Sequence, residues 1–154
     1  MYKRILVPID GSRTSNLGLN HALRLARDQR ARLKLVHVLD EFVIAQNIDM
    51  AGMSAELLDA FEKGGKAVVK NAKALAARHG IRAESALCRT MGGRAADAIV
   101  AEAKKWKADL IVIGTHGRRG VRRMVLGSDA EAVARAAPVP VLLVRPGGGE
   151  RRSR

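Results

Sequence analysis

Hydrophobic residues fall into short continuous runs, separated by longer segments in which they recur every three or four positions. The runs predict five buried strands, at residues 3–9, 32–39, 81–89, 109–113 and 138–144. The longer segments predict four helices, at residues 14–29, 53–79, 94–106 and 128–136. Strict alternation of strand and helix is typical of a parallel sheet with helices on both faces.

Right-handed crossovers leave few ways to arrange five such strands. We expect an α/β fold of the doubly wound, Rossmann-like type, a five-stranded parallel sheet in the order 3-2-1-4-5. In this order the winding reverses between the first and fourth strands, and ligands bind beyond the carboxyl ends of strands at that point. Gly64 and Gly65 each weaken the helix at 53–79 by about 1 kcal/mol relative to alanine, which predicts a kink or break there.

Composition narrows the class of protein. The 154 residues contain one cysteine, Cys88, which excludes an internal disulfide and a cysteine-cluster metal site. No apolar run reaches the roughly 18 residues of a membrane span. The first residues lead into a strand without a signal peptide, so we expect a cytoplasmic protein. We expect one domain at residues 1–145 and a flexible basic tail at 146–154.

Positive charge is concentrated in two short segments. The net charge is +13, and the chain carries four arginines at residues 118–123 and four more at 145–154. A basic cluster attracts phosphate, whether on a nucleotide or on a nucleic acid. For the tail, an ordinary solvated segment is an equally good interpretation.

Polar residues and glycines gather where the topology predicts a ligand. The first strand runs into Asp10, and the fourth strand runs into Gly114, Thr115 and His116. Asp10 either caps the following helix or accepts a hydrogen bond from a ribose or holds a phosphate-bound metal. His116 either contacts phosphate or is merely solvated.

A glycine-rich loop connects the fourth strand to the last helix. It contains Gly114, Gly117 and Gly127, followed by Ser128, in the spacing G-x2-G-x9-G-S. Glycines let backbone N–H groups approach a phosphate, and a helix amino terminus favours an anion. Alternatively, the glycines only make a turn and Ser128 forms a capping box with Glu131; both interpretations are compatible.

Other catalytic and binding motifs are missing from the sequence. It has no Walker A motif, no G-x-G-x-x-G after the first strand, no G-x-S-x-G and no histidine pair at zinc spacing. No base is placed to activate water, so we assign no catalytic residue and no protein-held metal site. We interpret His37 and Cys88 as structural.

Taken together, these motifs resemble the universal stress protein family over residues 2–145. The resemblance is carried by the segments around Asp10 and His37, the segment 108–117, the Gly127–Ser128 pair and the strand 138–144. It implies an adenine nucleotide alpha hydrolase-like fold, and the glycine spacing matches the ATP-binding branch. We therefore expect ATP, accompanied by Mg²⁺, as the ligand.

The resemblance also implies a role for each residue of the site. Asp10 would meet the ribose and the base edge, while Pro8 and Val38 would line the adenine pocket, with the Val38 backbone pairing to the base. The remaining residues would hold or reach the phosphates, namely Gly114, Gly117, Arg118, Gly127 and Ser128.

The resulting hypothesis is an ATP-binding stress-response protein with little or no turnover. The family resemblance implies a homodimer through the strand at 138–144, and an exposed apolar edge strand favours such pairing. Two alternatives stay open: a slow ATPase, and a basic protein that binds nucleic acid or an acidic partner. The near absence of aromatic residues speaks against recognition of single-stranded nucleic acid.

Overall fold

The computed structural model of the protein describes residues 1–41, 55–115 and 126–146. Its helices and strands follow one another in the predicted order: β1 (Arg4–Pro8), α1 (Arg13–Gln29), β2 (Arg32–Asp40), α3 (Ala55–Arg78), β3 (Ala83–Thr90), α4 (Ala95–Trp106), β4 (Leu110–Gly114), α5 (Ser128–Ala136) and β5 (Val141–Val144). Every predicted strand and helix in the described residues is confirmed.

The strands form one five-stranded sheet in the order β3-β2-β1-β4-β5, and every recorded pairing is parallel. The predicted order is therefore confirmed. β1 lies at the centre, where Leu6 is paired with Lys34 of β2 and with Ile111 of β4. The chain winds outward from β1 in both directions, so the carboxyl ends of β1 and β4 lie at the point of reversal.

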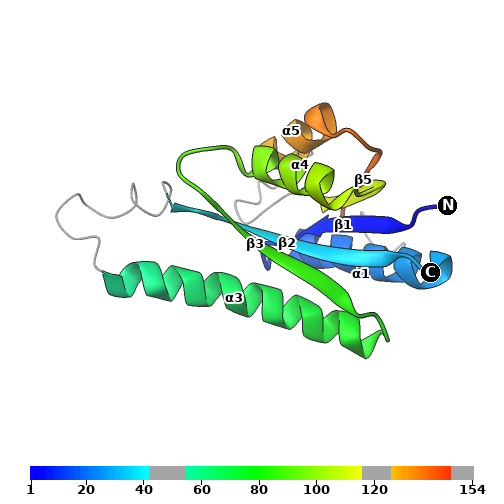
Figure 1. Cartoon of the computed structure of the whole chain (residues 1–154), viewed down its shortest axis with the longest axis horizontal. Coiled ribbons are helices and arrows are strands. Elements are labelled where there is room, and N and C mark those ends of the chain that lie inside the picture. Colours follow the sequence, from blue (N-terminus) through cyan, green and yellow to red (C-terminus); the bar gives the residue numbers. More distant parts are fainter. Residues whose placement is uncertain (42–54, 116–125, 147–154) are drawn as a thin grey trace, which may run out of the picture.

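Helices cover both faces of the sheet (Figure 1). α1 and α3 lie on one face and bury a cluster that includes Leu19, Leu23, Ala72 and Ala76. α4 and α5 lie on the other face and bury a cluster that includes Ile99, Ala103, Trp106 and Val133. The central strands β1 and β4 have apolar side chains on both faces, which explains why their sequences are continuous apolar runs.

The predicted break at Gly64 and Gly65 is wrong: α3 is one helix from Ala55 to Arg78. A Cβ on Gly65 would lie 3.0 Å from Leu39 Cδ2 and 3.1 Å from His37 Cδ2, so this glycine lets the helix approach β2 closely. Packing against the sheet outweighs the low helix propensity of two glycines. Nothing lies within 4 Å of a Cβ built on Gly64.

The last strand is shorter than predicted and begins at Val141 instead of residue 138. Pro138 and Pro140 have no N–H group to donate to a neighbouring strand. Pro140 still contributes its carbonyl, which accepts a hydrogen bond from the Ile111 amide at 3.0 Å. The ladder therefore becomes regular only after the second proline.

Within the described residues, none of the helices has the length and apolarity needed to cross a membrane. The assignment of residues 1–145 to one domain stays a prediction. The expected flexible tail falls on residues 146–154, of which only Pro146 is described.

Candidate functional site

The carboxyl end of β1 turns directly into α1, and Asp10 stabilises this turn. Its carboxylate Oδ1 accepts a hydrogen bond from the Ser12 amide at 2.8 Å, and its own amide donates to Ser15 Oγ at 3.1 Å. The cap of α1 is Ser12, whose Oγ accepts from the Ser15 amide at 3.2 Å. Ser12, not Asp10, is thus the capping residue, and Gly11 permits the turn with its φ of +78°.

The carboxyl end of β4 packs backbone to backbone against the first turn of α1. A Cβ on Gly114 would lie 2.6 Å from the Thr14 carbonyl oxygen and 3.0 Å from the Ser15 nitrogen. A Cβ on Gly18 would lie 3.2 Å from the Gly114 nitrogen. Gly114 therefore allows α1 to lie against β4, and this contact brings the ends of β1 and β4 together. The periodicity of α1 did not reveal that Gly18 has a part in this contact.

The amino terminus of α5 joins the same region. The Gly127 amide donates a hydrogen bond to the carbonyl of Thr115, the residue after β4, at 2.7 Å. Gly127 is the N-cap of α5, and no side chain makes a capping hydrogen bond. Because the amide groups of a first helical turn lack partners within the helix, they are available to an anion.

The predicted capping box of Ser128 and Glu131 is wrong. Ser128 is the first helical residue, one position too late to cap, and its side chain is exposed. Glu131 instead pairs with Arg135 at 2.7 Å. Asp129 also lies in this first turn, and its negative charge opposes an anion bound there.

β2 extends beyond β1 at the carboxyl ends of the strands and presents backbone groups there. Its ladder with β1 ends where Pro8 is paired with Val36 and the Ile9 amide donates to the Val36 carbonyl at 2.8 Å. Alternate residues of a strand direct their N–H and C=O groups to the same side, so those of Val38 point the same way as those of Val36. Because the ladder with β1 ends at Val36, the N–H and C=O groups of Val38 lie beyond the end of β1. The Val38 side chain packs on the α4 and α5 face.

Two residues interpreted as structural have well-defined surroundings. His37 is 5% exposed, and its Nδ1 lies 2.7 Å from the Ile9 carbonyl oxygen. Cys88 is half-buried on β3, and burial, followed by the charge of Glu102, raises the pKa of its thiol. A raised pKa keeps the thiol protonated and therefore a poor nucleophile.

The described part of the predicted site converges on one end of the sheet. Contacts through Ser15 and Thr115 connect Asp10, Gly114 and Gly127, while Pro8 and Val38 lie at adjacent strand ends. The other predicted residues, His116, Gly117 and Arg118, lie outside the described residues together with the arginine cluster at 118–123. In the ranges that the structure covers, no three His, Cys, Asp or Glu side chains are grouped to hold a metal ion.

Fold and site together define a doubly wound α/β protein whose candidate site is built chiefly from backbone groups. A model of the universal stress protein family matches residues 1–145, and the chain belongs to this family. It is 34% identical over 152 residues to universal stress protein YxiE of Bacillus subtilis, covering 94% of this chain and 100% of the relative.

Two solved structures extend the comparison. A universal stress protein family member from Burkholderia pseudomallei is 35% identical, with a TM-score of 0.74 and coverage of 93% of this chain and 96% of the other. A universal stress protein in complex with cAMP is 26% identical, with a TM-score of 0.66 and the same coverages. The Rossmann-like architecture is thus shared with both of these universal stress proteins.

Proposed function

We propose that this protein binds an adenine nucleotide at the carboxyl ends of β1, β2 and β4, and acts as a stress-response regulator with little or no turnover. ATP with Mg²⁺ is the form expected from the glycine spacing. The observation that carries the proposal is the meeting of Asp10, Gly114 and the uncapped amino terminus of α5 at the point of topological reversal. The relative solved with cAMP supports the choice of an adenine nucleotide.

Each part of the nucleotide has a matching group. The backbone of Val38 offers one N–H donor and one C=O acceptor to an adenine edge, beside the apolar ring of Pro8. The Asp10 carboxylate is an acceptor at the end of β1 and would accept hydrogen bonds from the ribose hydroxyls. The amides at the start of α5 and the Ser128 hydroxyl are donors for phosphate.

The proposed chemistry is binding without catalysis. Backbone amides donate hydrogen bonds to a phosphate but transfer no proton, and the described groups of the site are mainly of this kind. Binding of a nucleotide would stabilise the folded state by an amount that rises with the logarithm of the free nucleotide concentration above the Kd, which gives a direct readout.

The test is isothermal titration calorimetry with ATP, ADP, AMP and cAMP, with and without Mg²⁺, together with mass spectrometry of ligand released from fresh protein. We expect binding of at least one nucleotide and about a tenfold loss of affinity in Asp10→Ala, as for one lost charge-assisted hydrogen bond. Asp97→Ala is the matched control, because Asp97 is an exposed acid in the first turn of α4. Absence of heat with all four nucleotides at millimolar concentration would refute the proposal.

The same preparation tests the slow ATPase alternative. Phosphate release that survives repurification and falls in Asp10→Ala would favour an enzyme over a regulator. A rate equal to that of buffer would support binding alone. The nucleic-acid alternative predicts a steep salt dependence that disappears when residues 146–154 are removed.

We also propose a homodimer through β5. This strand is at the edge of the sheet, and its Leu142 and Leu143 side chains are each 38% exposed. Two-fold pairing would cover both edges at once. Sedimentation should give a dimer that Leu143→Lys dissociates; a monomer in the unmodified protein would refute the pairing. The cytoplasmic location stays a prediction.

A further inference from the structure

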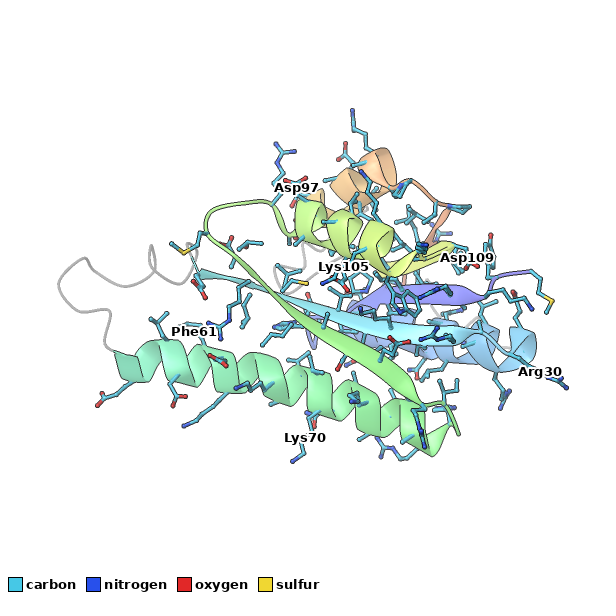
Figure 2. The ribbon with its side chains drawn as sticks, in the orientation of Figure 1. Arg30, Phe61, Lys70, Asp97, Lys105 and Asp109 are labelled. Atoms are coloured by element: carbon cyan, nitrogen blue, oxygen red, sulfur yellow. The ribbon has the colours of Figure 1, made fainter. Side chains whose placement is uncertain are left out.

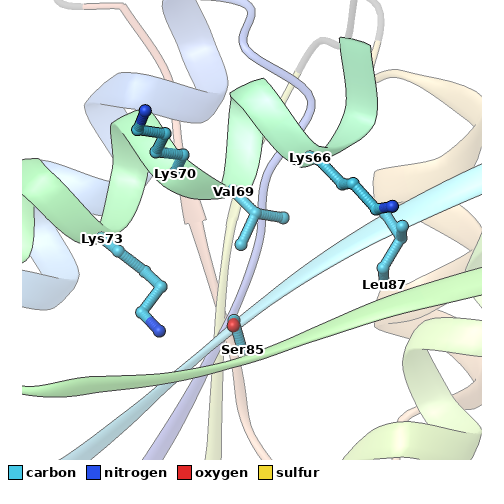
Figure 3. Close-up of a pocket in the computed structure, with 6 residues that line it drawn as sticks. All are labelled: Lys66, Val69, Lys70, Lys73, Ser85 and Leu87. Atoms are coloured by element: carbon cyan, nitrogen blue, oxygen red, sulfur yellow. The ribbon is translucent and has the colours of Figure 1, made fainter. Parts of the chain in front are cut away.

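A basic groove lies between α3 and β3, on a different part of the molecule from the strand-end site (Figure 3). Its volume is about 460 Å³, within the range of pockets that hold small organic ligands. We call it the α3–β3 groove, defined by its lining residues Lys66, Val69, Lys70, Lys73, Ser85 and Leu87.

The wall of the α3–β3 groove is partly apolar. Val69 of α3 packs against the core on the α1 and α3 face and is half-buried, as is Leu87 of β3. Ser85 and Leu87 are two residues apart on one strand, so both side chains point to the same face. Since β3 is an edge strand, no further strand of the sheet closes the groove on its outer side.

The rim of the α3–β3 groove is cationic. Lys66, Lys70 and Lys73 are spaced at i, i+4 and i+7 and so share one side of α3. Figure 3 shows the Lys66 side chain reaching toward Leu87 and that of Lys73 reaching toward the strand near Ser85, while the Lys70 amino group points away from the strand.

The lysines differ in how their charge is compensated. Lys66 pairs with Glu62 at 2.7 Å, and Glu62 also pairs with Arg89 at 2.6 Å. The hydrogen bonds from Lys66 and then Arg89 hold the pKa of Glu62 below its ordinary value, so this carboxylate stays ionised at neutral pH. Among the described residues, no ion pair includes Lys73.

We propose that the α3–β3 groove binds an organic anion with an apolar body, such as a carboxylate or sulfonate on an alkyl or aryl group. The anionic head would lie between the Lys73 ammonium and the Ser85 hydroxyl. The apolar body would cover Val69 and Leu87. An inorganic anion would pair with Lys73 but leave the apolar surface of Val69 and Leu87 exposed to water. A neutral lipid would cover that surface but leave the Lys73 ammonium without a partner.

This proposal does not depend on nucleotide binding. The groove shares no residue with the strand-end site, and β2 separates β3 from β1 in the sheet. Failure of one proposal therefore leaves the other intact.

The test uses decanoate as the probe, with 1-decanol as the uncharged probe of the same length. By calorimetry, the full-length protein should bind decanoate more tightly than 1-decanol. Lys73→Gln should weaken decanoate binding about fivefold, the upper range for an exposed ion pair, and should leave 1-decanol binding unchanged. Lys73→Arg should restore the affinity, since it keeps the charge.

Lys104→Gln is the matched control, because Lys104 is an exposed helical lysine on α4 that forms no ion pair among the described residues. It should leave decanoate affinity unchanged. Methyl NMR spectra should show shifts at Val69 and Leu87 on adding decanoate. In a second experiment, 8-anilinonaphthalene-1-sulfonate should become fluorescent with the protein and be displaced by decanoate.

Two results would overturn the proposal. One is an absence of decanoate binding at millimolar concentration, which would leave Lys66, Lys70 and Lys73 as solvated charges of α3. The other is binding that shifts the methyl groups of Leu142 and Leu143 instead, and that is equally strong in Lys73→Gln.

Discussion

The two ends of the sheet differ in the groups that they present. At the amino ends of the strands, charged side chains pair with one another and with backbone amides. At the carboxyl ends, glycines bring backbone segments into contact, and the amino terminus of α5 has no side-chain cap. Figure 2 shows Asp109 and Arg30 at the amino ends and Phe61 toward the opposite end of the molecule.

Most charged groups at the amino ends have partners within the chain, although the buried Arg4 Nε has no hydrogen-bond partner among the described residues. The Asp109 carboxylate accepts hydrogen bonds from the amides of Lys3 and Arg4, at 2.7 and 3.0 Å. The Arg4 guanidinium lies 4.9 Å from the centroid of the Trp106 ring, and the indole N–H donates to Glu84 at 3.1 Å. Groups that already have partners offer little to a ligand, so this end stabilises the fold.

At the carboxyl ends, two glycines take the place of paired side chains. Gly114 lets the backbones of β4 and α1 touch, and Gly127 leaves the amino terminus of α5 without a side-chain cap. The nearly buried charge pair of Lys34 and Glu102 thus lies away from the candidate ligand groups, while the Arg89–Glu62 pair at the carboxyl end of β3 is more exposed. Substitutions at the amino ends should change stability alone, while those at the carboxyl ends should also change ligand binding.

The largest effect is expected from Glu102→Leu. Lys34 and Glu102 form an ion pair with side-chain exposures of only 13% and 10%. Leaving the Lys34 ammonium without its partner should cost about 3 kcal/mol of unfolding free energy, measured by urea denaturation. Adding Lys34→Met should recover most of this loss.

The control for this prediction is Asp59→Asn, which breaks the exposed pair with Lys63 and should change stability by less than about 0.5 kcal/mol. In folded Glu102→Leu protein, nucleotide affinity should be unchanged. A loss of nucleotide affinity in Glu102→Leu would show that the buried ion pair also affects the candidate ligand site.

Gly114→Ala should have the next largest effect. Its Cβ would collide with the Thr14 carbonyl, so α1 must shift and stability should fall by about 2 kcal/mol. Nucleotide affinity should fall as well, because the same shift displaces the Asp10 turn. Gly64→Ala is the matched control: with open space around its Cβ, it should stabilise the protein by about 1 kcal/mol. Equal effects of the two substitutions would contradict this account.

Ser12→Ala should cost about 1 kcal/mol, measured by thermal and urea denaturation, because it removes the cap of α1. Ser12→Asp should retain most of the stability, since aspartate also caps helices well. A greater stability loss in Asp10→Ala than in Ser12→Ala would show that Asp10 has the larger part in holding the start of α1.

The smallest effect concerns Glu84 at the amino ends. Burial raises its pKa, but hydrogen bonds from Arg32 and Trp106 outweigh burial and hold the pKa below 4.5. A lowered folded-state pKa contributes stability above the unfolded value, and this contribution is lost as pH falls through the folded value. The stability difference between the protein and Glu84→Gln should therefore be constant above about pH 5 and vanish at lower pH.

The control for this pH profile is Glu56→Gln, an exposed acid of α3 that forms no ion pair among the described residues. Its stability difference should not follow the same pH dependence. A Glu84→Gln difference that grows on acidification would have the wrong sign and would contradict the account.

Patterns local in sequence were enough to predict the order of strands and helices and the convergence of Asp10, Gly114 and Gly127 at one end of the sheet. Continuous apolar runs such as residues 109–113 predicted buried strands, and the handedness of crossovers then restricted the sheet to the order observed. The same patterns could not tell Ser12 from Asp10 as the cap of α1, because both residue types cap helices and lie two positions apart.

The sequence by itself determined that this chain is a doubly wound α/β protein with polar and glycine residues at the point of reversal, since periodicity and turn chemistry act over a few neighbouring residues. Only the tertiary structure decided what Gly65 and Gly114 do, because each glycine is required by a segment distant in sequence that packs against it. The same holds for the α3–β3 groove, whose lysines and apolar wall come from two elements that meet only on folding.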